Sequence, residues 1–147
     1  MLGRISIVLC GVDDTEAGTT VMTAAKAAAE RAGAPLLLAQ VSTSHFGAQV
    51  PAFGADADAT ARVVEHGPTA QRILAVANGQ GASMIVVGTR ALRWRPSVAR
   101  RVARSAGCPV MIVGPSADPR AEPVTRPSFD RAFLRTAKAP VVVVPTP

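Results

Sequence analysis

Two groups of polar residues in this 147-residue chain could do chemistry, and the first follows an apolar run near the N-terminus. Asp13, Asp14 and Thr15 come soon after that run, at a place where the chain is expected to turn. An aspartate in such a turn either orients a ligand hydroxyl or caps the helix that follows. From the residues alone, both interpretations of Asp13 stay open.

The second group is a cluster of arginines beyond the middle of the chain. Guanidinium groups hold phosphate by paired contacts, and they also contact nucleic acid or acidic proteins. The alternative is a solvated helix face, because Arg100 and Arg104 are one helical turn apart. Nucleic acid is the less favoured partner, since Trp94 is the only tryptophan and aromatic residues make up only 3% of the chain. The net charge of +6 agrees with an anionic partner and equally with plain solubility. The cluster comprises Arg90, Arg93, Arg95, Arg100, Arg101 and Arg104.

Dedicated catalysis is not expected, because His45 and His66 stand apart in the sequence and near no pattern of nucleophile and carboxylate. The chain has no nucleophile elbow, no phosphate loop ending in Gly-Lys-Ser or Gly-Lys-Thr and no zinc spacing. Cys10 and Cys108 make no disulfide framework, so we expect buried free thiols in a reducing compartment. The first apolar run is too short for a signal peptide or a membrane span, which predicts a cytoplasmic protein without a membrane partner.

Aliphatic runs alternate with helical patterns along the chain, which predicts an α/β fold with an open, mostly parallel sheet. Alanine-rich helical stripes suit close packing of helices on both faces of that sheet. Gly33 is the expected left-handed stop of the first helix, and Pro68 is the expected first-turn residue of the second. The predicted strands span residues 5–10, 36–41, 62–65, 84–87 and 110–113, and the predicted helices span residues 17–32, a stretch from Pro68 onward, and 97–106.

The end of the chain repeats a helix and a strand, because residues 95–113 align without gaps onto residues 126–144. Chance recurrence in a biased composition is the alternative, but the shared Pro-Ser start, arginine spacing and Pro-Val strand start favour a duplication. We therefore expect a domain at residues 1–115, and at 116–147 a linker plus a repeated unit that packs on the same domain or on a partner subunit. Its strand at 141–144 should pair beside the fifth strand or compete for that edge. The identical pairs are Arg95/Arg126, Pro96/Pro127, Ser97/Ser128, Arg100/Arg131, Arg104/Arg135, Ala106/Ala137, Pro109/Pro140, Val110/Val141 and Val113/Val144.

Three segments carry a family resemblance. The first runs from Ile7-Val8 to Val12-Asp13-Asp14-Thr15, the second is GPTAQRIL at 67–74, and the third is ASMIVVGT at 82–89 followed by CPVMIV at 108–113. In order and spacing these segments resemble the universal stress protein family over about residues 4–115. The resemblance implies a Rossmann-like sheet of order 3-2-1-4-5, here with five or six strands. It also implies ATP or AMP at the carboxyl ends of strands 1 and 4, and a homodimer through the edge strand or the extension.

The resemblance also assigns residues to the nucleotide. It implies that Asp13 lies near the base or ribose and that the backbone of Val41 reads the adenine edge. The phosphate loop departs from the family pattern, since Ala91 stands at its second glycine position and Pro96 removes a backbone donor. The implied nucleotide-binding residues are Val12, Asp13, Thr15, Val41, Gly88, Thr89, Arg90, Ser97 and Val98.

Two functions follow from this pattern. The first is a stress-response regulatory protein that binds an adenine nucleotide, with at most slow incidental hydrolysis and no metal beyond the Mg²⁺ that accompanies a nucleotide. The second is a degenerate family member without nucleotide binding, which acts as a protein-interaction or dimerisation module. The first turn and Gly88 favour the nucleotide. Its loss is favoured by Ala91, by Pro96 and by the loop between them, where only residues 92–95 stand in place of the nine that the family pattern implies.

Overall fold

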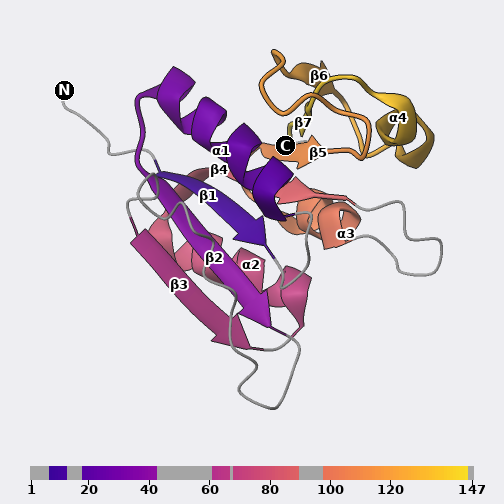
Figure 1. Cartoon of the computed structure of the whole chain (residues 1–147). Coiled ribbons are helices and arrows are strands. Elements are labelled where there is room, and N and C mark those ends of the chain that lie inside the picture. The colour runs from indigo at the N-terminus through magenta and orange to yellow at the C-terminus, as the bar shows by residue number, and fades with distance from the viewer. Residues whose placement is uncertain (1–6, 13–17, 43–60, 67, 90–97, 146–147) are drawn as a thin grey trace.

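The fold is a seven-stranded sheet with helices on both faces (Figure 1). The computed structural model describes residues 7–12, 18–42, 61–66, 68–89 and 98–145. The strands lie in the order β3-β2-β1-β4-β5-β7-β6. They are β1 (Ile7–Val12), β2 (Leu36–Ser42), β3 (Ala61–His66), β4 (Ala82–Gly88), β5 (Val110–Val113), β6 (Val124–Arg126) and β7 (Val141–Val143), and the helices are α1 (Gly18–Ala32), α2 (Thr69–Gln80), α3 (Val98–Ser105) and α4 (Arg131–Thr136).

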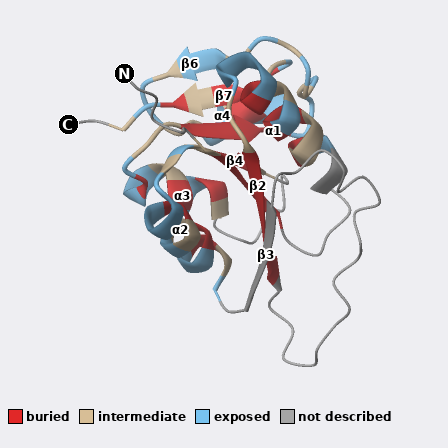
Figure 2. Cartoon of the chain, turned by 90° about the vertical axis from the view of Figure 1, so that its left-hand side faces the viewer, coloured by how far each residue is buried: buried red, intermediate tan, exposed pale blue. Residues whose placement is uncertain are grey.

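The first five strands are parallel and take the order 3-2-1-4-5, which confirms the predicted α/β class. Most of the described side chains at the centre of the sheet are aliphatic, and they are buried because helices cover both of its faces (Figure 2). Helix α1 covers one face through Val21 and four alanines, whose small side chains let the helix lie close to the strands. Helices α2, α3 and α4 cover the other face.

The predicted turn signals have clear counterparts in the backbone. Gly33 follows α1 with a φ of 63°, so the expected left-handed stop is confirmed. Pro68 differs slightly from its prediction, since it precedes α2 as an extended N-cap residue and lies outside the first turn. The fixed φ of −60° of Pro68 also suits the N-cap position. The helix loses no hydrogen bond through the missing N–H of Pro68, because an N-cap N–H has no partner within the helix.

Three further predictions are corrected by the structure. Strand β1 continues through Gly11 and Val12, beyond the predicted strand end at residue 10. The segment predicted as a linker holds strand β6, so the sheet has seven strands where five or six were expected. No signal in the sequence marks β6, because its three residues between prolines are too few to show a periodic pattern. The strand forms through its backbone pairing with β7. Cys10 is buried as predicted, whereas Cys108 is only half-buried, because it lies just before β5.

Strand β7 adds to the sheet of its own chain, beside β5 as predicted. Strand β7 runs antiparallel to β5 and parallel to β6. Both strands of the extension are therefore antiparallel to the first five strands. The extension thereby covers the β5 edge of the parallel sheet.

Candidate functional site

The carboxyl ends of β1 and β4 form the candidate site. The two strands are parallel neighbours, with Gly11 opposite Val87 near their ends. Strands β2 and β3 lie on one side of β1, and β4 and β5 lie on the other. The direction in which strands are added to the sheet therefore reverses between β1 and β4. In open α/β sheets, ligands bind in the crevice at such a reversal. The reversal of strand order therefore lies where the sequence predicted a ligand site.

The structure brings several predicted site residues to this edge. Val12 ends β1, Val41 lies near the end of β2, and Gly88 ends β4. The side chains of Val12 and Val41 are buried in the core, so only their backbone groups can serve a ligand. Val98 is half-buried and begins α3. The remaining predicted residues, Asp13, Thr15, Arg90 and Ser97, lie outside the described part of the chain.

Gly88 has a packing role that the sequence did not reveal. A Cβ built on Gly88 would overlap Cγ2 of Val21, so α1 crosses the end of β4 at a distance that only glycine permits. On the opposite face, a Cβ on Gly11 would come within 2.6 Å of Cδ1 of Ile73 in α2. Gly88 alone is therefore no evidence for a phosphate loop, because helix packing already requires it.

Thr89 follows Gly88 and is tied to the neighbouring strand. Its backbone N–H donates to the carbonyl of Val113 at 3.0 Å. That N–H is therefore already engaged, and it is not available to a phosphate in this conformation. The half-buried side chain of Thr89 lines a small hollow with room for about one water molecule.

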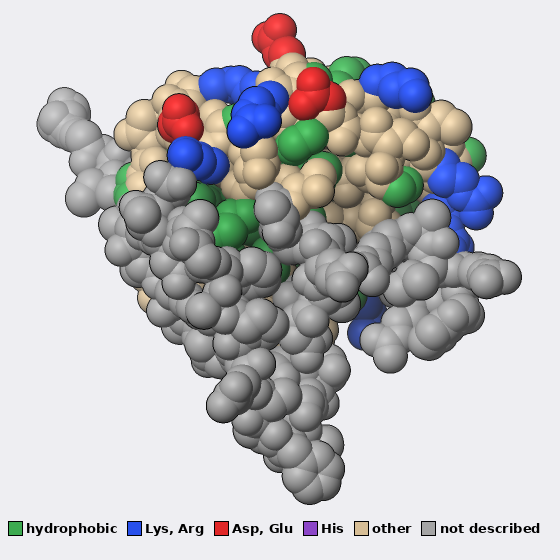
Figure 3. Space-filling view, in the orientation of Figure 1, with side chains coloured by type: hydrophobic (Ala, Val, Ile, Leu, Met, Phe, Trp, Pro, Cys, Tyr) green, Lys and Arg blue, Asp and Glu red, His purple; other side chains and the backbone are tan. Residues whose placement is uncertain are grey.

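Two arginines of the extension also line the hollow beside Thr89. Arg131 and Arg135 project from α4, and both side chains are exposed. The other lining residues are Pro115, Phe129 and Leu134. In Figure 3, Lys and Arg side chains lie at the right-hand edge, on the side of the molecule where α3 and α4 lie, and others lie along the top beside acidic side chains. Positive charge at this end of the sheet favours an anion near the carboxyl ends of β4 and β5.

Sequence reasoning missed two features of this edge. The repeat aligns Arg131 and Arg135 with Arg100 and Arg104, but it gave no sign that α4 would lie next to Thr89. Gln40 was also missed. It is a fully buried polar side chain, one residue before Val41 and opposite Val12 in the register of β1 and β2. Its signal was a single polar residue within the aliphatic run LLLAQV.

Burial changes the chemistry of the cysteines on this sheet. Removal from water raises the pKa of the Cys10 thiol to about 12 and also raises the pKa of Cys108. Both thiols are therefore poor nucleophiles near neutral pH.

Within the described ranges, no three His, Cys, Asp or Glu residues are grouped closely enough to hold a metal ion. Across the same residues, no helix has the length and apolar character needed to cross a bilayer.

Comparisons with known proteins agree on one family. The model of the universal stress protein family matches residues 47–114. A universal stress protein solved in complex with cAMP is 23% identical, with a TM-score of 0.60, and the alignment covers 74% of this chain and 96% of that one. A universal stress protein from Lactobacillus plantarum is 21% identical, with a TM-score of 0.59, over 76% of this chain and 99% of that one. One from Archaeoglobus fulgidus, solved with dAMP, is 18% identical, with a TM-score of 0.53, over 74% of this chain and 97% of that one. No curated protein matches. At these identities the structural likeness establishes the fold.

Proposed function

Because the chain is related to the universal stress protein family through residues 47–114 and through its fold, we propose that it is a cytoplasmic stress-response regulatory protein that binds an adenine nucleotide. The nucleotide, ATP or AMP, binds at the carboxyl ends of β1 and β4. The observation that carries the proposal is the reversal of strand order between these two strands. Two proteins of the same fold were solved with cAMP and dAMP, which supports an adenine ligand.

The described residues fit the two ends of such a ligand unequally. At the base end, backbone groups of Val12 and Val41 lie at the same edge of the sheet, where they read the adenine and ribose. At the phosphate end, the N–H of Thr89 is engaged by Val113, so fewer backbone donors face the anion. The hydroxyl of Thr89 and the charge of Arg135 support the phosphates there.

The proposed role is that of a ligand-binding regulator, with ATP hydrolysis at most slow and incidental. A bound nucleotide supplies a signal through its occupancy of the site, and Mg²⁺ enters only as its counterion. Two observations favour a second candidate, a degenerate protein-interaction module without nucleotide. Gly88 is required by its packing against Val21, and the N–H of Thr89 is already paired.

Calorimetric titration of the intact chain with ATP and AMP, and with GTP as the base control, separates the two candidates. The nucleotide role predicts saturable one-site binding of the adenine nucleotides and weaker binding of GTP. Fluorescence of Trp94, the only tryptophan, gives a second readout. Absence of heat and of a fluorescence change at millimolar ATP and AMP would leave the interaction module as the function.

Two arginine variants test the phosphate end. Arg135→Ala is expected to weaken ATP about two- to fivefold, since an exposed charge contributes on the order of 0.5–1 kcal/mol. AMP carries fewer phosphate charges and should lose less. Arg104→Ala is the matched control, because Arg104 lies in the last turn of α3, the helix that leads to the amino end of β5. Equal losses in both variants would assign the effect to the net charge of the protein and not to the hollow.

A further inference from the structure

The C-terminal extension repeats a complete strand–helix–strand unit in three dimensions. In the first unit, β4 and β5 are parallel around α3, with Ile85 opposite Val110. In the second unit, β6 and β7 are parallel around α4, with Val124 opposite Val141. Val141 is the counterpart of Val110 in the sequence repeat. The structural repeat therefore includes β6, which the sequence alignment did not reach.

Backbone hydrogen bonds recur at the same places in both units. The N–H of Ile85 donates to the carbonyl of Pro109 at 3.1 Å, and the N–H of Val124 donates to that of its counterpart Pro140 at 2.9 Å. At the helix ends, the N–H of Ala106 donates to the Val102 carbonyl at 2.9 Å, and that of Ala137 donates to the Phe133 carbonyl at 3.0 Å. The two units thus share strand register and helix ending.

The pairing between the units is symmetric about its centre. Met111 lies opposite Val142, which is its own counterpart in the repeat. Val110 lies opposite Val143, the counterpart of Ile112, and Ile112 lies opposite Val141, the counterpart of Val110. Such reciprocal pairing of antiparallel strands is the pattern of an isologous two-fold interface.

The burial of the two units obeys the same symmetry. Val110 and Ile112 lie in the core under α2 and α3, and Val141 and Val143 lie in that same core with Leu134 of α4. Met111 and Val142 both face the core under α1. The pseudo-two-fold axis therefore passes through the sheet between β5 and β7, and it leaves both helices on one face.

We propose that the extension fills, within one chain, the place that a second copy would take at the β5 edge, where the family resemblance implies that two copies pair. Strand β7 takes the position of the partner's β5, β6 takes that of the partner's β4, and α4 takes that of the partner's α3. The intact chain is then closed at this edge and monomeric there. This revises the homodimer that the resemblance implied through the edge strand or the extension.

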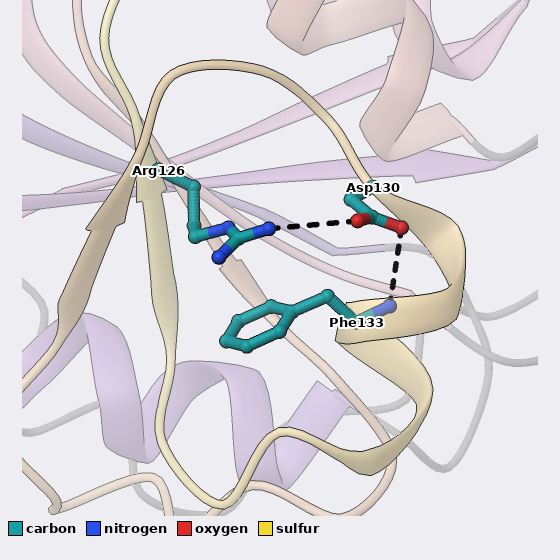
Figure 4. Close-up of polar contacts among 3 residues, drawn as sticks. All are labelled: Arg126, Asp130 and Phe133. Carbon is teal, nitrogen blue, oxygen red and sulfur yellow. Dashed lines mark hydrogen bonds and ion pairs between the residues drawn. The ribbon is translucent and has the colours of Figure 1, made fainter.

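The new outer edge carries features that oppose further pairing. Strand β6 has only three residues and lies between Pro123 and Pro127. Arg126, at its end, forms an ion pair with Asp130 at 3.5 Å and lies over the ring of Phe133, 4.2 Å from its centroid (Figure 4). Short strands, flanking prolines and charges are the usual protection of sheet edges. The extension replaces a hydrophobic four-residue edge with a protected one.

Close contacts hold the extension on its own chain. The carbonyl oxygen of Leu134 lies where a Cβ on Gly114 would stand, so α4 rests directly on the backbone after β5. The Ser116 hydroxyl donates to the Arg135 carbonyl at 3.1 Å, and the N–H of Asp118 donates to the Lys138 carbonyl at 2.9 Å. The Gly114 contact gives a single position at which the extension can be released while β5 stays unchanged.

A cross-link in the full chain tests closure within one molecule. Met111→Cys with Val142→Cys, in a Cys108→Ser background, places two thiols on directly opposed antiparallel residues, within disulfide reach. We expect oxidation to link positions 111 and 142 within single chains, with the solution mass of one chain by light scattering. Cross-links between positions 111 and 142 of two different chains would show that β7 is exchanged between copies and would overturn the proposal.

Release of the extension tests the self-pairing edge. Gly114→Val forces α4 away from β5. This variant is combined with Cys108→Ser and with Met111→Cys as the single reporter thiol. We expect its solution mass to double and a disulfide to form between positions 111 of two copies. Val142→Pro breaks the same pairing from the β7 side and serves if Gly114→Val does not fold. Val144→Pro is the matched control, since Val144 lies beyond the ladder and is exposed. A released, folded chain that stays monomeric without this cross-link would contradict the proposal.

Discussion

Replacement of Gly88 by alanine tests why glycine stands at the end of β4. The added methyl group would overlap Cγ2 of Val21, which is 5% exposed and held between α1 and the sheet. Overpacking of a closely packed core costs about 1–3 kcal/mol. Gly88→Ala should therefore destabilise the chain by that amount.

A second substitution turns this prediction into a measurement of the contact itself. Val21→Ala alone removes two methyl groups from the core and should cost about 1–3 kcal/mol. In the double variant the added methyl fills the space that Val21 vacates, so the two costs should not add. We expect a favourable coupling energy of about 1–2 kcal/mol.

Urea unfolding followed by far-UV circular dichroism gives these free energies, provided that the denaturant dependence stays the same in all variants. Gly79→Ala is the matched control, because a Cβ there meets nothing within 4 Å and alanine favours the helical conformation by about 0.5–1 kcal/mol. Gly88→Ala within 0.5 kcal/mol of the parent, on the order of an ordinary surface substitution, would refute the packing role. The packing role would also be refuted if the free-energy losses of the two single variants added up to the loss in the double variant.

Three further predictions concern particular side chains. The unfolded chain releases the Cys10 proton above about pH 9, whereas the folded chain keeps it to about pH 12, so stability should fall with rising pH between these values. The free energy of unfolding in urea, measured from pH 8 to 10.5, should decline more in the parent than in Cys10→Ala, by up to about 1.4 kcal/mol per pH unit, and equal slopes would contradict the effect of burial. Leu134→Ala should cost about 2–5 kcal/mol in urea unfolding, because Leu134 is 2% exposed and anchors α4, and a cost near zero would mean that α4 is not docked. Asp130→Ala should cost about 1 kcal/mol by the same measurement, since its carboxylate accepts from the N–H of Phe133 at 3.2 Å, whereas Asp130→Asn should keep most of this cap. An asparagine variant as unstable as the alanine variant would assign the loss to the ion pair with Arg126 instead.

The parallel part of the fold was predictable because its signals are local. Residues 110–113 form the predicted strand within the predicted limits, since a fully buried strand reads as a continuous aliphatic run. Gly11 misled the prediction of β1, because glycine usually marks a turn. Here it lies within the strand, where Ile73 packs too closely for a side chain. That reason depends on a residue 62 positions away and has no local signal.

The extension was only partly predictable from its sequence. The repeat correctly placed a strand beside β5, but a repeat does not fix strand direction, which depends on the path of the chain from Gly114 to Pro123. For the candidate site, the alternation of strands and helices placed Val12 and Gly88 at one edge. The approach of Arg135 to Thr89 arises from the docking of α4 and could not be read from spacing.

A crystal structure of the intact chain grown with millimolar AMP tests the nucleotide site most directly. Adenosine should lie over the carboxyl ends of β1 and β4, with its base beside the backbone of Val41 and its phosphate toward Thr89 and Arg135. Density for AMP at any other place, or an unoccupied edge at saturating AMP, would contradict an adenine nucleotide as the ligand of this sheet.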